Sequence, residues 1–246
     1  MTAPEAHQGT IWGLGLGPGE PDLMSVRADR LLRGARHVAY FRKAGRPGQA
    51  RQIVNGMIGP EAVEFPMEYP VTTEIALEDP AYNTALSSFY ADCAAHLAEL
   101  SDRGEEVVVL CEGDPFFYGS FMHLYTRLSA THPVQVVPAI TGMSGAWTAT
   151  GQPITWGDDV LTVLMATLPE DDLARRMADT DALVVMKIGR NIDKVRRALE
   201  RAGKLGDAWI VEYATMPGQR VSRLSEVDGV TPYFSIVIVH GHGRRP

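Results

Sequence analysis

The 246-residue chain has 45% hydrophobic and 22% charged residues, which is ordinary for a globular protein of one large or two medium domains. Its formal net charge of -7 argues against non-specific binding to nucleic acid, which needs clustered lysines and arginines. The N-terminal residues MTAPEAHQGT lack the basic and apolar regions of a signal peptide, and no apolar run is long enough to cross a bilayer. We therefore expect a cytoplasmic protein with no membrane partner.

Short apolar runs bounded by glycine, proline and aspartate alternate with helical patterns along the chain. This alternation predicts an α/β fold rather than a helical bundle or a β-sandwich. Strands are expected at 10–15, 37–41, 106–111, 133–137, 159–167, 181–188, 208–215 and 233–240, with one more around Val221. Helices are expected from a cap at Asp22 or Ser25 to Gly34, at 82–104, 119–130, 169–179 and 191–203, and from about residue 141.

Two features of the first half predict a buried core. The helix that ends near Gly104 carries one apolar stripe at helical spacing, made by Tyr82, Leu86, Phe89, Cys93, Leu97 and Leu100. The strand at 106–111 is apolar on both faces, which is typical of a sheet covered by helices on each side. Cys93 and Cys111 lack metal-ligand spacing, so we expect buried thiols and no metal site, while His240 and His242 are expected in a polar tail.

A segment rich in glycine and proline, PVQVVPAITGMSGAWTATGQP, separates two regions of helices and strands. Such a composition loosens the chain and marks a boundary. We therefore expect two α/β domains, at 1–135 and 136–246.

The turn after the first strand, GLGLGPGE, has four glycines but does not match a dinucleotide-binding fingerprint. The third glycine of that fingerprint falls on Pro18 or Glu20, depending on where the count begins. The glycines therefore indicate either a tight turn or a place where a ligand or a neighbouring backbone approaches closely.

Two more turns follow predicted strands, at the end where open α/β sheets bind ligands. In CEGDP, Gly113 allows close approach and the carboxylate of Asp114 can bond a hydroxyl or an ammonium group; the alternative is that Asp114 caps the following helix. In VPAITGMSGAW, Thr141 and Gly142 offer hydroxyl and amide groups to a polar small molecule, unless Thr141 is only a helix cap.

Positive charge is concentrated between residues 27 and 51, where eight arginines or lysines occur with one acid. In an acidic chain, this concentration indicates a local anion site. For its helical part, a solvated helix face is an equal alternative; for FRKAGRPGQAR, expected to be a loop, we favour anion binding.

Five stretches in this order, GLGPGEPDLMSVRADRLL, EGDPFFYGS, VPAITGMSGA, MKIGRN and VEYATMPGQ, resemble the tetrapyrrole methylases that use S-adenosylmethionine in corrin and siroheme synthesis. The resemblance covers nearly the whole chain. It implies two α/β domains with the cofactor in a cleft between them, a tetrapyrrole trough alongside, and a homodimer. The first domain would supply the trough with the GPGE and EGDP loops, and the second would complete the cofactor site.

The resemblance also implies roles for individual residues. Cofactor contacts carry over to Pro18, Glu112, Gly113, Asp114, Phe117, Thr141, Gly142, Ile188 and Ala214. Two positions depart from the family pattern: Ala139 replaces a glycine, and Ile188 replaces a methionine. The implied substrate is a reduced tetrapyrrole with eight carboxylates, whose arms could pair with Arg42, Lys43 and Arg46.

The sequence contains none of the common motifs for a catalytic nucleophile or a metal-bound water. Methyl transfer from a sulfonium needs mainly the alignment of two reactants, because the donor already carries the leaving group. Tyr118, His123 and Glu112 lie near the predicted site in sequence, but spacing does not choose a general base among them. We therefore assign no catalytic residue.

Overall fold

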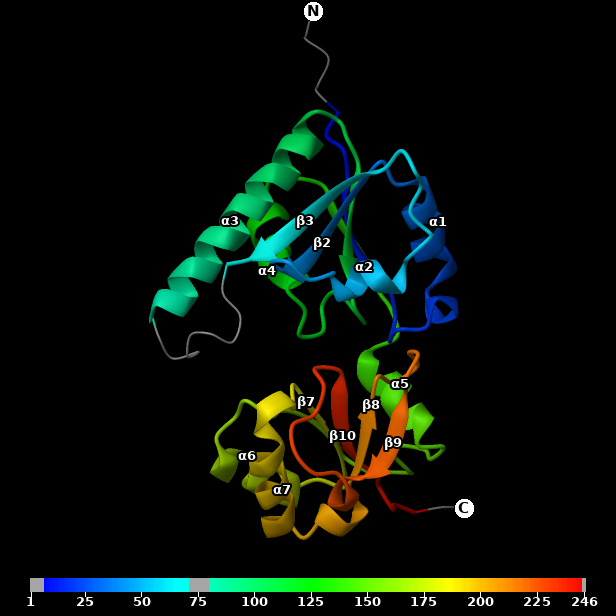
Figure 1. The fold of residues 1–246 in the computed structure, drawn as a ribbon, viewed down its shortest axis with the longest axis vertical. Helices are drawn as coiled ribbons and strands as arrows, with labels where there is room; N and C mark the ends of the chain where they lie inside the picture. Colours follow the sequence, from blue (N-terminus) through cyan, green and yellow to red (C-terminus); the bar gives the residue numbers. More distant parts are fainter. Residues whose placement is uncertain (1–6, 71–79, 245–246) are drawn as a thin grey trace, which may run out of the picture. The chain divides into compact units, whose positions relative to one another are not determined.

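The computed structural model describes residues 7–70 and 80–244. The chain folds into two compact units, Met1–Thr141 and Gly142–Pro246, which we call unit 1 and unit 2 and describe separately. Each unit is built around one five-stranded sheet (Figure 1). The predicted α/β class is therefore confirmed in both halves of the chain.

Unit 1 contains a parallel sheet with strand order β3-β2-β4-β1-β5. The strands are β1 (Ile11–Gly15), β2 (His37–Lys43), β3 (Val63–Tyr69), β4 (Val107–Cys111) and β5 (Val134–Val137). Because every pairing is parallel, the carboxyl ends of the five strands lie at one edge of the sheet. The turns after β1, β4 and β5 are the glycine-rich stretches singled out from the sequence.

Helices cover both faces of the unit 1 sheet, with α3 and α4 on one side and α1 and α2 on the other (Figure 1). Their bounds are α1 (Val26–Gly34), α2 (Gln49–Ile53), α3 (Pro80–Asp102) and α4 (Phe121–Leu128), with a short 3-10 turn, η1 (Pro21–Leu23). The Ala28 N–H donates to Ser25 Oγ at 3.1 Å, so Ser25 rather than Asp22 is the cap of α1. Cys93, Leu97 and Leu100 on α3 are buried, which confirms the C-terminal half of the predicted stripe.

Unit 2 contains a mixed sheet with strand order β6-β7-β10-β8-β9. Its strands are β6 (Leu161–Met165), β7 (Ala182–Met186), β8 (Trp209–Glu212), β9 (Arg220–Arg223) and β10 (Ser235–Val239). Since β10 is antiparallel to both β7 and β8, while β6 is parallel to β7, the carboxyl ends of β6, β7 and β8 share one edge.

The unit 2 sheet is also covered on both faces. Its helices are α5 (Gly142–Ala149), α6 (Glu170–Ala178) and α7 (Ile192–Arg201), with 3-10 turns η2 (Gly189–Asn191), η3 (Leu205–Asp207) and η4 (Leu224–Glu226). Side chains of α6 and α7 pack into one hydrophobic cluster with the sheet, and those of α5 pack into another. In the described part of the chain, no helix combines the length and apolar character that crossing a bilayer would require.

The structure differs from the sequence-based prediction in several places, among them β3, for which no strand was expected. The expected boundary after residue 135 lies inside β5, which pairs with β1, so the division falls after Thr141 instead. The segment 41–51 is only partly a loop, because β2 continues to Lys43 and α2 begins at Gln49. His240, expected in a polar tail, is buried just after β10, with Nδ1 3.0 Å from the Pro153 carbonyl oxygen.

Candidate functional site

Two of the glycine-rich turns of unit 1 are joined by backbone hydrogen bonds at the carboxyl edge of the sheet. Where the pairing of β1 with β4 ends, the Leu16 N–H donates to the Cys111 carbonyl oxygen at 3.0 Å. The Gly113 N–H donates to the Gly17 carbonyl oxygen at 2.8 Å. Gly17 and Gly113 have φ values of 82° and 63°, which L side chains rarely adopt, so these two positions favour glycine.

The carboxylate of Asp114 connects the turn after β4 to the turn after β5. Its Oδ1 accepts a hydrogen bond from the Phe116 N–H, and its Oδ2 accepts one from the Ala139 N–H, both at 2.9 Å. Asp114 does not cap α4, which was the alternative to ligand binding, since the N-cap of that helix is Ser120. Asp114 therefore has a structural role that the sequence did not indicate, although each oxygen keeps a lone pair for a further donor.

Gly15, the last residue of β1, leaves no room for a side chain between these turns. A Cβ at this position would lie 2.6 Å from the Ala139 Cβ and 2.9 Å from both Pro115 Cδ and the Val137 carbonyl oxygen. Two of these neighbours belong to backbone or to a proline ring, which cannot rotate away. The turns after β1, β4 and β5 thus form one closely packed surface, which we call the triple-turn surface.

Glu112 reaches away from its own turn. The Ala50 N–H donates to Glu112 Oε1 at 3.0 Å, which joins the turn after β4 to α2 across 62 residues of sequence. As a whole residue, Glu112 is exposed to solvent. Desolvation around its carboxyl group nevertheless raises the pKa of that group, and the hydrogen bond from the Ala50 N–H opposes this shift.

Strained backbone marks the loops after three strands. Among the described residues, the non-glycine positions with left-handed φ are Tyr118 after β4, Lys187 after β7, and Tyr213 and Thr215 after β8. Residues held in this region cost about 1 to 3 kcal/mol each and gather at functional sites. The sequence gives no signal for them, because none is a glycine or an asparagine.

The cofactor residues implied by the resemblance are divided between the two units. Those in unit 1, all in the three turns, are Pro18, Glu112, Gly113, Asp114, Phe117 and Thr141; those in unit 2 are Gly142, Ile188 and Ala214. Ile188 is fully buried, and its side chain packs in the hydrophobic cluster of α6 and α7. Its carbonyl oxygen already accepts from the Asn191 N–H at 2.7 Å.

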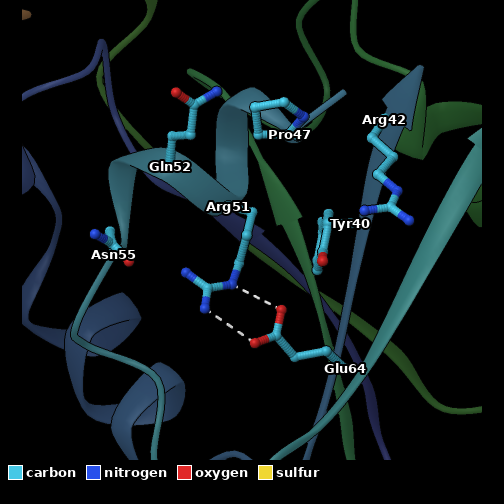
Figure 2. Close-up of a pocket in the computed structure, with 8 residues that line it drawn as sticks. Tyr40, Arg42, Pro47, Arg51, Gln52, Asn55 and Glu64 are labelled. Atoms are coloured by element: carbon cyan, nitrogen blue, oxygen red, sulfur yellow. Dashed lines mark hydrogen bonds and ion pairs between the residues drawn. The ribbon is translucent and has the colours of Figure 1, made fainter. Parts of the chain in front are cut away.

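A cavity of about 480 Å³ lies beside α2 in unit 1 (Figure 2). Its lining residues are Tyr40, Arg42, Pro47, Gly48, Arg51, Gln52, Asn55 and Glu64. Arg51 is held by Glu64 through two hydrogen bonds, at 2.7 and 3.0 Å, which lower the pKa of the Glu64 carboxyl and raise that of the Arg51 guanidinium. We call this site the α2 cavity.

The three cations expected to bind substrate arms lie in different surroundings. Arg42 lines the α2 cavity and pairs with Glu68, with Nη2 2.6 Å from Oε1. Lys43 is the last residue of β2 and is half-buried. Arg46 is exposed and forms no ion pair with a described residue. Sequence reasoning missed Tyr40, Gln52, Asn55 and Glu64 as cavity residues, because no local pattern links β2, α2 and β3.

Comparison with known proteins identifies relatives that match nearly the whole chain. A precorrin-2 C(20)-methyltransferase from Sinorhizobium sp. is 49% identical over 239 residues, covering 97% of this chain and 98% of that protein. A cobalt-precorrin-2 C(20)-methyltransferase from Salmonella typhimurium is 29% identical over 94% of this chain and 96% of that protein. A solved structure of cobalt precorrin-4 methyltransferase superposes with a TM-score of 0.73 at 21% identity and covers 98% of each chain.

The family model that matches is described as tetrapyrrole (corrin/porphyrin) methylases, and it spans residues 10–228, from the first residue before β1 to the segment after η4. The match therefore includes the triple-turn surface, the α2 cavity and the unit 1 sheet, together with β6 to β9 of the unit 2 sheet, while β10 lies beyond it. On this evidence, the chain belongs to the tetrapyrrole (corrin/porphyrin) methylases.

Proposed function

We propose that this chain transfers a methyl group from S-adenosylmethionine to C20 of precorrin-2, giving precorrin-3A in cobalamin biosynthesis. The observation that carries the proposal is 49% identity, over nearly the full length of both chains, to a protein named for that activity. A cytoplasmic homodimer, expected from the sequence and the resemblance, belongs to the same proposal.

The triple-turn surface is the part of unit 1 that we propose for donor binding. It presents the main chain of Gly113, the carboxylate of Asp114 and the hydroxyl of Thr141, while Phe117 offers an aromatic ring. Pro18, implied by the resemblance, is buried in the turn after β1. A sulfonium donor with an amino acid end and a ribose needs such a mixture of hydrogen-bonding groups. Gly142, Ile188 and Ala214 in unit 2 stay a prediction from the resemblance.

The chemistry asks the protein mainly to align two reactants. Holding the methyl group about 3 to 3.5 Å from an electron-rich ring carbon can lower the activation barrier by roughly 7 to 11 kcal/mol. An in-line displacement then forms the new carbon–carbon bond, releases S-adenosylhomocysteine, and leaves a ring proton to be lost. No residue is assigned to take that proton.

The α2 cavity and the cations next to it are proposed to bind carboxylate arms of the tetrapyrrole. Arg51 is fixed through Nε and Nη2, so its third nitrogen, Nη1, keeps its hydrogen atoms for another acceptor. Arg46 adds an exposed charge nearby in sequence. Guanidinium groups of this kind match the planar geometry of carboxylates.

Replacing Arg42 and Arg46 together by glutamine should raise the KM for the tetrapyrrole roughly five- to thirtyfold, because each of the two lost charged contacts is worth about 0.5 to 1 kcal/mol at the protein surface. Affinity for S-adenosylhomocysteine, measured by titration calorimetry, should stay the same. Arg103→Gln is the matched control, since Arg103 is exposed and follows α3 toward the amino end of β4. An unchanged KM in the double variant would remove these cations from the substrate site.

Two related substrates are alternatives, cobalt-factor II and uroporphyrinogen III. Identity to the cobalt-precorrin-2 enzyme is 29%, against 49% for the precorrin-2 enzyme, which favours a ring without metal. The deciding experiment incubates the purified protein with S-adenosylmethionine and each of the three tetrapyrroles. We expect mass spectrometry to show one added methyl group on precorrin-2, and NMR to place it at C20; methylation of another ring alone would refute the proposal.

A further inference from the structure

The short helix α2 cannot be capped by its own N-cap residue. That residue is Gly48, and a Cβ there would lie 2.8 Å from the Phe41 carbonyl oxygen and 2.8 Å from the Tyr40 ring. A serine or aspartate therefore does not fit at this position, although a helix start normally needs such a side chain for its free N–H groups. The cap has to come from elsewhere in the fold.

Glu112 supplies this missing cap from the end of β4. Its Oε1 accepts from the Ala50 N–H, the second residue of α2, at 3.0 Å. A carboxylate at a helix N-terminus also interacts favourably with the partial positive charge of the free N–H groups. The Ala50 side chain is buried in a hydrophobic cluster of unit 1, so packing and the hydrogen bond from Glu112 hold the same end of α2.

The helix that Glu112 holds forms one wall of the α2 cavity, through Arg51 and Gln52 and the preceding Pro47 and Gly48. We propose that Glu112 is a positioning residue: its carboxylate fixes α2 and thereby the substrate-binding wall of the cavity, and it does not itself bind the donor. Its own turn belongs to the triple-turn surface, so one side chain links the donor side of unit 1 to the substrate side. This inference rests on the proposed function for the meaning of the two sides.

Hydrogen exchange of the protein without ligands tests the structural half of the proposal. In Glu112→Ala, amide exchange in the peptide covering α2 should become roughly five- to tenfold faster, because the cap is lost. Glu112→Gln keeps an acceptor oxygen and should stay close to the original protein. Glu61→Ala, which removes an exposed carboxylate elsewhere in unit 1, is the matched control and should leave α2 unchanged.

Kinetics test the functional half. Glu112→Ala should raise the KM for precorrin-2 about five- to tenfold while the affinity for S-adenosylhomocysteine stays the same, and Glu112→Gln should restore the KM. Weaker S-adenosylhomocysteine binding in both variants, with unchanged exchange in α2, would overturn the proposal and make Glu112 a donor ligand. Absence of methylation by the unaltered protein would refute the proposed function instead, while the exchange result would still decide whether Glu112 holds α2.

Discussion

Gly15→Ala should reduce methyl transfer at least a hundredfold and lower the melting temperature. The new methyl group would lie 2.6 Å from the Ala139 Cβ and 2.9 Å from the Val137 carbonyl oxygen, distances that require the turn after β5 to move. Forcing extra volume into a packed site costs about 1 to 3 kcal/mol. A displacement of about 1 Å in a group that aligns reactants can itself cost a hundredfold in rate.

The measurement compares the initial rate of methylation with the thermal unfolding curve. Gly34→Ala is the matched control: Gly34 also has an ordinary φ, and a Cβ built there meets no described atom within 4 Å other than its chain neighbours and the backbone of its own helix. That variant should keep full activity and at least the original stability, because alanine restricts the unfolded chain. If Gly15→Ala retained the original rate, the close contact of the three turns would not matter for the reaction.

The secondary structure of this protein was largely predictable where the hydrophobic period is long. The apolar stripe of α3 and the continuous apolar run of β4 can be recognised in the sequence, because side chains that face the core recur at a regular spacing along each element. Ser25 was one of two candidate caps, and the structure selects it. In contrast, α2 spans five residues, too few for a period to emerge from Gln49–Ile53.

The location of the candidate site was predictable, but its internal contacts were not. Glycine and aspartate after buried strands indicate the ligand-binding edge of an open sheet, and the turns meet there. The partner of each side chain depends on packing between distant segments. Glu112 accepts a hydrogen bond from α2, and Asp114 accepts one from the turn after β5. Neither pairing can be predicted from the spacing of neighbouring residues in the sequence.

Asp114→Ala should weaken the binding of S-adenosylhomocysteine at least tenfold and also destabilise the fold. The carboxylate accepts two backbone hydrogen bonds, from Phe116 and Ala139, and each bond to a charged group is worth about 1.5 kcal/mol or more. Loss of about 3 kcal/mol lowers the melting temperature by roughly 6 to 12 °C in a chain of this size. Without the connection, the turns after β4 and β5 no longer hold one arrangement toward the donor.

Asp114→Asn separates charge from shape. One amide oxygen can still accept a hydrogen bond, but the NH₂ group then faces the other backbone N–H, so we expect a loss of stability close to that of alanine. Asp22→Ala, which removes an exposed carboxylate from η1, is the control and should change neither property. Calorimetry well below the unfolding transition decides the role of Asp114: if S-adenosylhomocysteine binds both Asp114 variants with the original affinity while their melting temperatures fall, the carboxylate only fastens the turns and the donor lies elsewhere.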